Sequence, residues 1–505
     1  MTDLNISLQH ARKYEREAAG RIEAEERPAF HFTPPAGWMN DPNGFSYYQG
    51  KFHLFFQYFP YSSHWDKMHW GHAVSEDLIH WTYLPAVMAP DRAYDKDGCY
   101  SGSALELQDG RQLLLYTGVR IDHDENGVQS EHQEQCIAVG DGMDYQKYPL
   151  NPVISGDMLP PDSSRVHFRD PKMWEENGHI YCLAANARAS DGSGRLLMFR
   201  SEDGFNWTFD RILIENDNLY GKMWECPDYF RLDGKEVIIV SPQDMLPEGL
   251  EFHNGNGTLC LIGRTDETGK FVPDSLHSID YGIDFYAPQT IMTPDGRRVM
   301  IGWMQNWDAC AMRGPEEPWA GQMSLPREIH VQDGRLFQRP LRELEHLRKN
   351  RIAYDHVVVS DEVTLGGLSG RMAEIEITLT PADKKYLYRR FDLFVAQDDV
   401  YRTAISFFPQ ECVLEIDRKF SGSRRAIMHR RKCQTGSRKD GVIRLRVILD
   451  RYSIEVFIND GEKTMTATIY TDLSADGISF YADGTAYMDI VKYDLEAERI
   501  ISFGR

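Results

Sequence analysis

Three carboxylates in the sequence stand in short, rigid settings that suit acid–base chemistry. Asp41 lies in WMNDPNG, Asp170 in FRDP and Glu225 in MWECPDYF, so each has a proline within two residues. Proline and glycine restrict the local backbone and therefore the direction of neighbouring side chains. Cleavage of a glycosidic bond requires one ionised carboxylate as nucleophile and one protonated carboxyl as acid. A third carboxylate can hold substrate hydroxyls or stabilise developing positive charge.

The neighbours of these carboxylates should set their pKa values. Arg169 precedes Asp170, and its charge should keep nearby carboxylates ionised. Trp224 and Cys226 flank Glu225, and we expect this apolar setting to raise the pKa of Glu225 towards that of a working acid. Carboxylates that face one cavity also repel, so the pKa of at least one should rise. No His or Asn pattern accompanies Cys226, which argues against a thiol nucleophile.

Two patterns recur about every 60 residues and indicate the elements that position the carboxylates. The first is an aspartate followed four residues later by Trp or Tyr, found at Asp77, Asp141 and Asp203, with a degenerate copy at Asp266. The second is a residue beside proline or glycine just before an apolar run, found at Asp41, Ser101, Asp170, Glu225 and Ala287. A period near 60 in short antiparallel strands is typical of a β-propeller.

The predicted fold is all-β, a five-bladed β-propeller followed by a β-sandwich domain. Aromatic and β-branched runs such as 51–59 and 111–119 predict strands, and apolar–polar alternation near the C-terminus predicts the sandwich. The predicted segments are an N-terminal helical extension (1–27, with a helix over 5–26), the propeller (28–338), a charged linker helix (339–352) and the sandwich (353–505). The innermost strands of a propeller line a central funnel, so the three carboxylates should meet at one mouth.

Composition excludes several classes of partner. The 505 residues include 56 Lys and Arg against 77 Asp and Glu, a formal net charge of −21. This balance argues against binding nucleic acid or docking on an anionic membrane. The first 27 residues lack the apolar stretch of a secretory signal, and the eight cysteines are scattered without CxxC spacing. These features predict a cytoplasmic protein with reduced thiols.

We expect no cofactor and no metal. DHDENGVQSEHQ (122–133) resembles a calcium-binding EF-hand loop, but Gln133 occupies the last ligand position and a strand precedes it. We therefore predict a solvated loop at the funnel rim. The spacing of His64, His69, His72 and His80 does not indicate a metal site. The basic segment 421–439 is interpreted as a solvated hairpin loop, with a docking patch for an acidic partner as the alternative.

At the three carboxylate blocks the chain resembles glycoside hydrolase family 32, the family of invertases, sucrose-6-phosphate hydrolases and fructanases. Further matching blocks run to YSIEVFINDGE (452–462), so the resemblance covers both predicted domains. It implies a retaining β-fructofuranosidase that acts through a covalent fructosyl-enzyme. Asp41 then matches the nucleophile, Glu225 the acid/base and Asp170 the transition-state stabiliser.

The resemblance also implies a pocket for the fructosyl group. The residues at its expected positions are Asn40, Gln57, Trp65, Ser101, Arg169 and Trp303. Tyr100 stands where the family usually has Phe, and we expect the pocket to tolerate it. Cys226, next to the acid/base, completes the predicted substrate-binding set.

Several alternatives stay open at this stage. The substrate can be sucrose, sucrose 6-phosphate or a short fructo-oligosaccharide, and the fructosyl group can pass to a sugar instead of water. A phosphorylated substrate would need a basic residue at the rim, for which the candidates are Arg120, Arg165, Arg188, Lys222 and Arg313. The competing functions are an inverting arabinan or xylan hydrolase and a non-catalytic carbohydrate-binding propeller. The oligomeric state is also open, with a homodimer among the alternatives.

Overall fold

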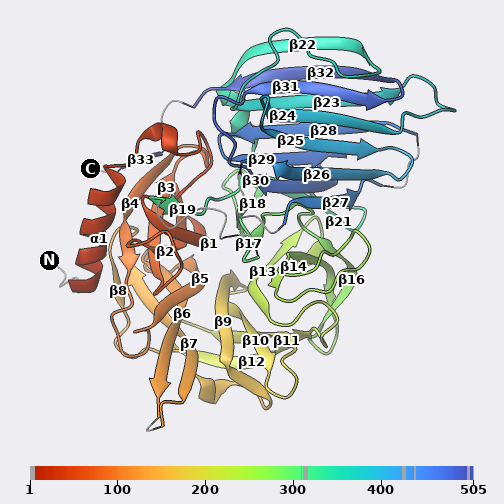
Figure 1. Ribbon diagram of the computed structural model, residues 1–505. Coiled ribbons are helices and arrows are strands. Elements are labelled where there is room, and N and C mark those ends of the chain that lie inside the picture. Colours follow the sequence, from red (N-terminus) through yellow and green to blue (C-terminus); the bar gives the residue numbers. More distant parts are fainter. Residues whose placement is uncertain are drawn as a thin grey trace.

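The computed structural model describes residues 6–124, 126–308, 310, 317–422, 428–436, 440–497 and 501–503. Strands form most of the regular structure, and the protein is all-β as predicted. Figure 1 shows an N-terminal region whose sheets surround a common centre, and a C-terminal region of stacked sheets beside it. None of the described helices is long and apolar enough to cross a lipid bilayer.

Five sheets occupy the N-terminal region, and four antiparallel strands form the body of each. The first contains β1 (Gly37–Tyr48), β2 (Lys51–Phe59), β3 (His69–Ser75) and β4 (Trp81–Met88), and the second contains β5 (Gly98–Glu106), β6 (Gln112–His123), β7 (Gln129–Gly140) and β8 (Tyr145–Lys147). The third contains β9 (Ser163–Glu176), β10 (His179–Arg188), β11 (Gly194–Ser201) and β12 (Trp207–Glu215). The fourth contains β13 (Trp224–Leu232), β14 (Lys235–Pro242), β15 (Leu259–Thr265) and β16 (Phe271–Ser278), and the fifth contains β17 (Tyr286–Met292), β18 (Arg298–Trp303), β20 (Arg327–Gln332) and β21 (Arg335–Pro340).

The first strands of these sheets form a closed ring. Each of β1, β5, β9 and β13 contacts the first strand of the next sheet, and β17 contacts β1. Two short strands extend the first sheet at its edges: β19 (Trp319–Ala320) pairs in parallel with β1, and β33 (Ile501–Phe503) pairs in parallel with β4. The first sheet therefore combines segments from distant parts of the sequence.

The recurring aspartate with a following aromatic residue marks a turn. The carboxylate of Asp77 accepts hydrogen bonds from the backbone N–H groups of Ile79 (2.9 Å) and His80 (2.7 Å) just before β4. The equivalent aspartates before β8, β12 and β16 also accept backbone N–H groups of their own turns. An Asp side chain that bonds to the backbone a few residues ahead stabilises a tight turn. The pattern thus identifies the connection between third and fourth strands in four of the sheets.

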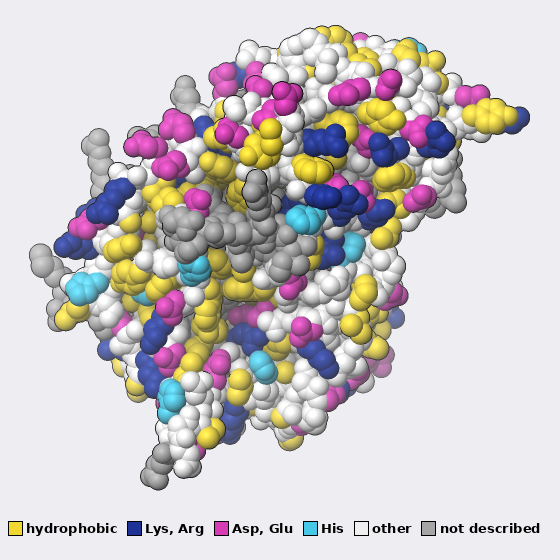
Figure 2. Space-filling model, viewed as in Figure 1, with side chains coloured by type: hydrophobic (Ala, Val, Ile, Leu, Met, Phe, Trp, Pro, Cys, Tyr) yellow, Lys and Arg dark blue, Asp and Glu magenta, His cyan; other side chains and the backbone are white. Residues whose placement is uncertain are grey.

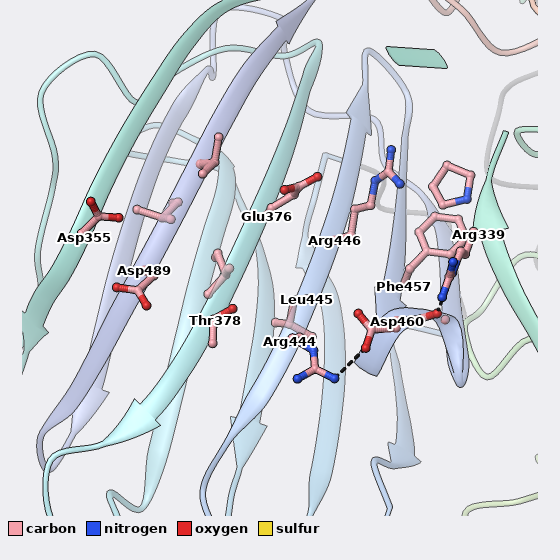
Figure 3. A pocket seen from close by; sticks show the side chains of 15 residues that line it. Arg339, Asp355, Glu376, Thr378, Arg444, Leu445, Arg446, Phe457, Asp460 and Asp489 are labelled. Atoms are coloured by element: carbon pink, nitrogen blue, oxygen red, sulfur yellow. Dashed lines mark hydrogen bonds and ion pairs between the residues drawn. The ribbon is translucent and has the colours of Figure 1, made fainter. Parts of the chain in front are cut away.

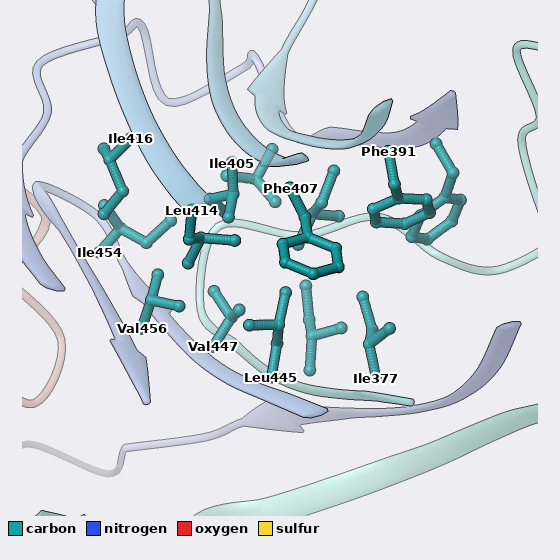
Figure 4. Packing of buried hydrophobic residues seen from close by; sticks show 14 of the residues in the cluster. Ile377, Phe391, Ile405, Phe407, Leu414, Ile416, Leu445, Val447, Ile454 and Val456 are labelled. Atoms are coloured by element: carbon teal, nitrogen blue, oxygen red, sulfur yellow. The ribbon is translucent and has the colours of Figure 1, made fainter. Parts of the chain in front are cut away.

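The C-terminal region is a β-sandwich of two packed sheets. One sheet contains β22 (Arg348–Val359), β32 (Ala486–Leu495), β23 (Ala373–Pro381), β28 (Ile443–Asp450), β29 (Ser453–Ile458) and β30 (Lys463–Thr468). The other contains β27 (Arg430–Gln434), β26 (Val413–Phe420), β25 (Arg402–Phe408), β24 (Arg390–Gln397) and β31 (Gly477–Asp483). Ile377, Leu445 and Val456 of the first sheet face Ile405, Phe407 and Leu414 of the second in a fully apolar core (Figure 4).

The helical predictions need two corrections. The helix expected over 5–26 is α1 (Ile6–Ala19), and a separate 3-10 turn, η1 (Ala24–Glu26), follows it. The linker helix expected over 339–352 is only the 3-10 turn η4 (Arg342–Leu347), and the chain then enters β22 at Arg348. Leu344 and Leu347 are buried at the three-residue spacing of a 3-10 helix. Pairing of β22 with β32 overrides the helix propensity of the charged residues that follow. Two further 3-10 turns are η2 (Gly156–Met158) and η5 (Asn459–Gly461).

A buried network of charges joins the two regions. His31, just before β1, places Nδ1 2.8 Å from Asp450 Oδ2 and Nε2 2.9 Å from Glu455 Oε1, both in the sandwich. Arg327 of β20 donates to the same Glu455 (2.6 Å) and to Asp280 (3.0 Å). Burial disfavours a charged His31, but the two carboxylates outweigh it and raise its pKa to about 9. The interface is therefore held by a histidine that is cationic at neutral pH.

The raised pKa of His31 predicts a pH-dependent stability. An unfolded histidine has a pKa of about 6.5, so the stabilisation is complete below that pH and is lost progressively as the pH rises towards 9. We expect the urea midpoint of the protein to fall between pH 6.5 and 8.5, and the fall to be shallower in His31→Gln. Equal slopes for the two proteins, measured by denaturation at several pH values, would contradict the assignment.

Candidate functional site

Each of the five first strands contains a β-bulge at the position of the second sequence pattern. The register of strand pairing shifts between Met39 and Pro42 in β1, and corresponding shifts occur in β5, β9, β13 and β17. In β9, β13 and β17 the bulge contains a residue with positive φ, namely Asp170 (+61°), Cys226 (+48°) and Ala287 (+51°). A bulge inserts one extra residue and redirects a side chain. The bulges therefore orient the three predicted carboxylates towards the centre of the ring.

Asp41 lies almost fully buried in β1. Its Oδ2 accepts a hydrogen bond from the Ser101 hydroxyl (2.7 Å) and lies 3.4 Å from the Cys226 thiol. Burial raises the pKa of Asp41, the negative charge of Glu225 adds to this rise, and the hydrogen bonds from Ser101 and Cys226 oppose it. Among the described residues, none makes a hydrogen bond of good geometry to its Oδ1. Asp41 thus presents one unpartnered carboxylate oxygen.

Asp170 is the carboxyl that burial affects most clearly. Its Oδ2 accepts a hydrogen bond from the Cys226 backbone N–H (3.0 Å) and lies 3.6 Å from the Cys226 thiol. Burial raises the pKa of Asp170 to about 7; Arg169 lowers it, and the charges of Glu225 and Asp41 raise it further. The expectation that crowding raises at least one pKa is confirmed here. The cluster therefore retains a proton close to neutral pH.

The apolar setting predicted for Glu225 is wrong. Its Oε1 accepts two hydrogen bonds from the Arg169 guanidinium, at 3.1 Å from Nε and 2.9 Å from Nη2, and its Oε2 accepts one from the Tyr286 hydroxyl at 2.6 Å. Trp224 instead packs into an apolar cluster between the third and fourth sheets. Arg169, expected to act on its neighbour Asp170, makes its shortest contacts with Glu225. Two polar side chains therefore fix the orientation of this carboxylate.

The three carboxylates line a single cavity of about 450 Å³. Figure 2 shows acidic and basic side chains next to each other in the hollow at the centre of the ring. Nine residues predicted to be catalytic or substrate-binding line it: Asn40, Asp41, Gln57, Trp65, Tyr100, Ser101, Arg169, Asp170 and Glu225. The lower residues, such as Asn40 and Ser101, are buried, whereas Trp65 is 44% exposed and packs edge-on against Tyr100. The cavity therefore has a polar base and an aromatic lip.

Two predicted binding residues, Trp303 and Cys226, lie behind the cavity wall. Trp303 is fully buried in an apolar cluster, where it contacts Trp38 and Trp307. Cys226 is also buried, with its thiol between Asp41 and Asp170. Neither residue lines the cavity, but each contacts residues that do, so their direct contact with the sugar stays a prediction. Trp307, four residues beyond Trp303, lines the cavity instead.

The remaining lining residues were not predicted from the sequence. They are Glu131, Gln133, His167, Gln243, Asn256 and Trp307. Glu131 and Gln133 belong to β7, so the solvated loop predicted for 122–133 is wrong at its C-terminal end, where Gln133 is buried. Gln133 also accepts a hydrogen bond from Arg169 (3.3 Å). The EHQEQ segment that precedes the apolar part of β7 is polar throughout, so the sequence carries no strand signal that could have revealed this.

Four of the five predicted phosphate-binding candidates lie in the described part of the chain, and none of these four lines the cavity. Arg165 pairs with Asp157 (2.9 Å), Arg188 with Asp191 (2.7 Å) and Arg120 with Asp122 (2.9 Å). Lys222 is exposed outside the lining set, and Arg313 lies outside the described residues. Among the lining side chains, Arg169 is the one that is permanently cationic, and it already pairs with Glu225.

A second groove, of about 470 Å³, lies on the outer face of the sandwich where it meets β21. Figure 3 shows charged side chains along it, with Arg444 paired to Asp460 (2.6 Å). Arg446 pairs with the buried Glu374 on the same face of the sheet (2.6 Å). The groove lacks converging buried carboxylates, so the cavity at the centre of the ring is the better candidate for catalysis. Within the described ranges, no three His, Cys, Asp or Glu side chains are arranged to hold a metal ion.

Comparison with known protein families covers almost the whole chain. The model of the glycosyl hydrolases family 32 N-terminal domain matches residues 31–340, and that of the family 32 C-terminal domain matches residues 343–497. A raffinose invertase of Escherichia coli is 36% identical over 91% of this chain and 94% of its own length. A sucrose-6-phosphate hydrolase of the same species is 35% identical over 90% of this chain and 91% of its own length.

Solved structures give a similar result. A variant of a β-fructofuranosidase of Bombyx mori, in complex with sucrose, superposes with a TM-score of 0.82 at 31% identity, covering 99% of this chain and 100% of that one. A sucrose-6-phosphate hydrolase from Lactobacillus gasseri superposes with a TM-score of 0.83 at 28% identity, covering 98% of this chain and 97% of that one.

The coupling between the buried carboxyls can be tested directly. The charge of Asp41 contributes to the raised pKa of Asp170, so Asp41→Asn should move the titration of the Asp170 carboxyl below pH 7. Difference infrared spectra of the carboxyl stretch, recorded between pH 4 and 9, would follow this titration, and Asp170→Asn would identify the band. An unchanged midpoint in Asp41→Asn would show that the two carboxyls do not interact.

Proposed function

The chain belongs to glycosyl hydrolase family 32, and from this membership and its carboxylate geometry we propose a retaining β-fructofuranosidase that cleaves sucrose or sucrose 6-phosphate. The observation that supports this most strongly is the convergence of Asp41, Asp170 and Glu225 on one cavity. A non-catalytic sugar-binding protein would have no need for three carboxyls crowded into one cavity. Short fructo-oligosaccharides, which also carry a terminal fructosyl group, are further substrates in this proposal.

In the proposed first step Asp41 is the nucleophile. Its unpartnered Oδ1 forms a bond to C2 of the fructosyl ring while the bond from C2 to the glycosidic oxygen breaks. Glu225 donates its proton to that oxygen, so the leaving sugar departs as a neutral alcohol. The hydrogen bond from Ser101 holds the other oxygen of Asp41 during the attack.

In the second step water releases fructose. The carboxylate of Glu225 takes a proton from water, the water oxygen bonds to C2, and the ester bond to Asp41 breaks. Two displacements at C2 retain the configuration. The same intermediate can transfer the fructosyl group to a sugar hydroxyl, with Glu225 acting as the base in both cases.

Asp170 and Arg169 are proposed to distribute the proton of the cluster. In the free enzyme Asp170, with a pKa of about 7, holds the proton while Arg169 and Tyr286 bond to Glu225. Fructosyl hydroxyls that donate to Asp170 would favour its ionised form. The proton is then available to Glu225, where the leaving oxygen needs it. Ionised Asp170 also stabilises the positive charge that develops on the ring in the transition state.

The architecture and location fit this assignment. We propose that the five sheets are the blades of a β-propeller, supported by the closed ring of their first strands. We also propose that the enzyme acts in the cytoplasm. This location is supported by the cysteines, which are scattered along the sequence without CxxC spacing, and seven of the eight are buried.

Substitutions separate the proposed roles. Asp41→Asn should reduce kcat for sucrose by several orders of magnitude with little change in folding, because the amide cannot form the ester. Asp109→Asn makes the same chemical change in an exposed turn and should leave activity unchanged.

With Glu225→Ala, added azide should trap the intermediate of an activated fructoside as a fructosyl azide that retains the configuration. Normal sucrose turnover by Asp41→Asn, or an azide product of inverted configuration, would contradict the mechanism.

The raised pKa of Asp170 predicts the alkaline limb of the pH profile. Catalysis needs one proton in the carboxyl cluster, and the cluster loses it as the pH rises through about 7. We expect kcat/KM for sucrose to fall above pH 7 and to fall again at low pH, where Asp41 becomes protonated. A kcat/KM that stays constant from pH 6 to 9 would exclude this proton as the catalytic one.

A further inference from the structure

The mouth of the cavity has a wall formed by two loops. Gln243 and Asn256 lie on the connection between β14 and β15, and Trp307 follows β18. All three are partly exposed, whereas Asn40 and Ser101 at the base of the cavity are buried. If the fructosyl group occupies the base, as the proposed function requires, the leaving sugar lies at the mouth, and this wall forms one side of the mouth.

Reciprocal hydrogen bonds make the two loops one unit. Asp308 accepts hydrogen bonds from the backbone N–H (3.0 Å) and the side-chain amide (3.3 Å) of Asn256. Asn306 donates to the Asn256 carbonyl (2.8 Å) and accepts the Asp308 N–H (2.8 Å). Gly255 has a φ of +94°, and a Cβ there would stand 2.3 Å from the Asp308 carboxylate. This close approach means that a shift of either loop moves the other.

The sandwich contacts this unit through Arg431 of β27. Its guanidinium donates to the carbonyl oxygen of Asn254 (3.3 Å), two residues before Asn256. Arg431 and Asn256 also line the same small pocket between the two regions. The neighbouring strand β26 is fixed to the N-terminal region by the buried pair of Arg418 with Asp284. The charge of Arg431 is therefore held at a defined place beside the mouth wall, close enough to Asp308 for the two charges to attract.

We propose that Arg431 of the sandwich is a positioning residue for the leaving-group side of the active site. It fixes the loop of Asn256 through Asn254, and Asp308 passes this constraint to the loop of Trp307. The sandwich thereby sets the affinity for the sugar that leaves, whereas the first strands of the ring set the chemistry at C2. This role rests on the proposed function.

The residue that precedes Arg431 in β27 provides a matched control. Arg430 is exposed and pairs with Asp417 within its own sheet (2.6 Å). We expect Arg431→Met to raise KM for sucrose about tenfold with little change in kcat, and Arg431→Lys to recover part of the loss. Arg430→Met should match the wild type. Methyl β-fructofuranoside, whose leaving group is too small to reach the wall, should react equally with all four proteins.

Other outcomes would overturn the inference. Unchanged sucrose KM in Arg431→Met would remove the positioning role. Equal losses on sucrose and methyl β-fructofuranoside would indicate general damage to the site, and a loss confined to sucrose 6-phosphate would make Arg431 a phosphate ligand instead. If Arg431→Met folds poorly, Asp308→Asn tests the same wall and should raise the sucrose KM alone. A wild type that cleaves neither sugar would refute the proposed function, whereas active proteins that do not differ would refute only this inference.

Discussion

The site depends on one backbone constraint, an extra residue inserted at the same place in each first strand. A regular strand alternates its side chains between two faces and would not direct successive polar residues into one cavity. At the bulges of β9, β13 and β17 the chain adopts a positive φ that non-glycine residues rarely adopt. Local strain of this kind persists only where surrounding structure imposes it. Strand pairing on either side of each bulge and contact with the next first strand supply that structure here.

The bulges bring three carboxyl groups together, and a small number of hydrogen-bond donors reduces the repulsion between them. Arg169 is the one guanidinium among the described lining residues, and it pairs with Glu225 while its charge also acts on Asp170. Cys226 donates its backbone N–H to Asp170 and places its thiol beside Asp41. The arginine and these donors offset part of the repulsion among the three carboxyls, and burial together with the remaining repulsion raises the pKa of Asp170.

The sequence allowed the carboxylates and the all-β class to be predicted because both leave local signals. Asp41, Asp170 and Glu225 stand in short blocks with proline, and the turn aspartates repeat about every 60 residues. The partners of Glu225 could not be predicted in the same way. Its pairing with Tyr286, 61 positions later, depends on how two sheets meet and not on neighbours in sequence. The apolar environment expected for Glu225 from its neighbour Trp224 was wrong for a different reason, because successive residues of a strand point to opposite faces.

Tertiary contacts also explain two other differences between the sequence predictions and the structure, which concern the linker helix and Trp303. The residues from Arg348 onwards have the composition of a helix, but they form a strand because β32 offers a partner. Trp303, expected in the pocket from its place in a sequence block, is buried against Trp38 and Trp307, and of these Trp307 lines the cavity. A sequence motif identifies a segment that lies near the cavity. The packing of side chains decides which residue of that segment lines the cavity.

The two edge strands of the first sheet have a consequence for how the protein is made. During synthesis from the N-terminus, β1 to β4 emerge first, but β19 and β33, which cover the two edges of that sheet, emerge only much later. Until then β1 and β4 each present unpaired backbone groups, which can recruit strands from other chains. The first sheet is synthesised first, yet it should stay open to pairing with strands of other chains for the longest time. The carboxylate-bearing strand β1 should therefore be among the last strands to become fully paired.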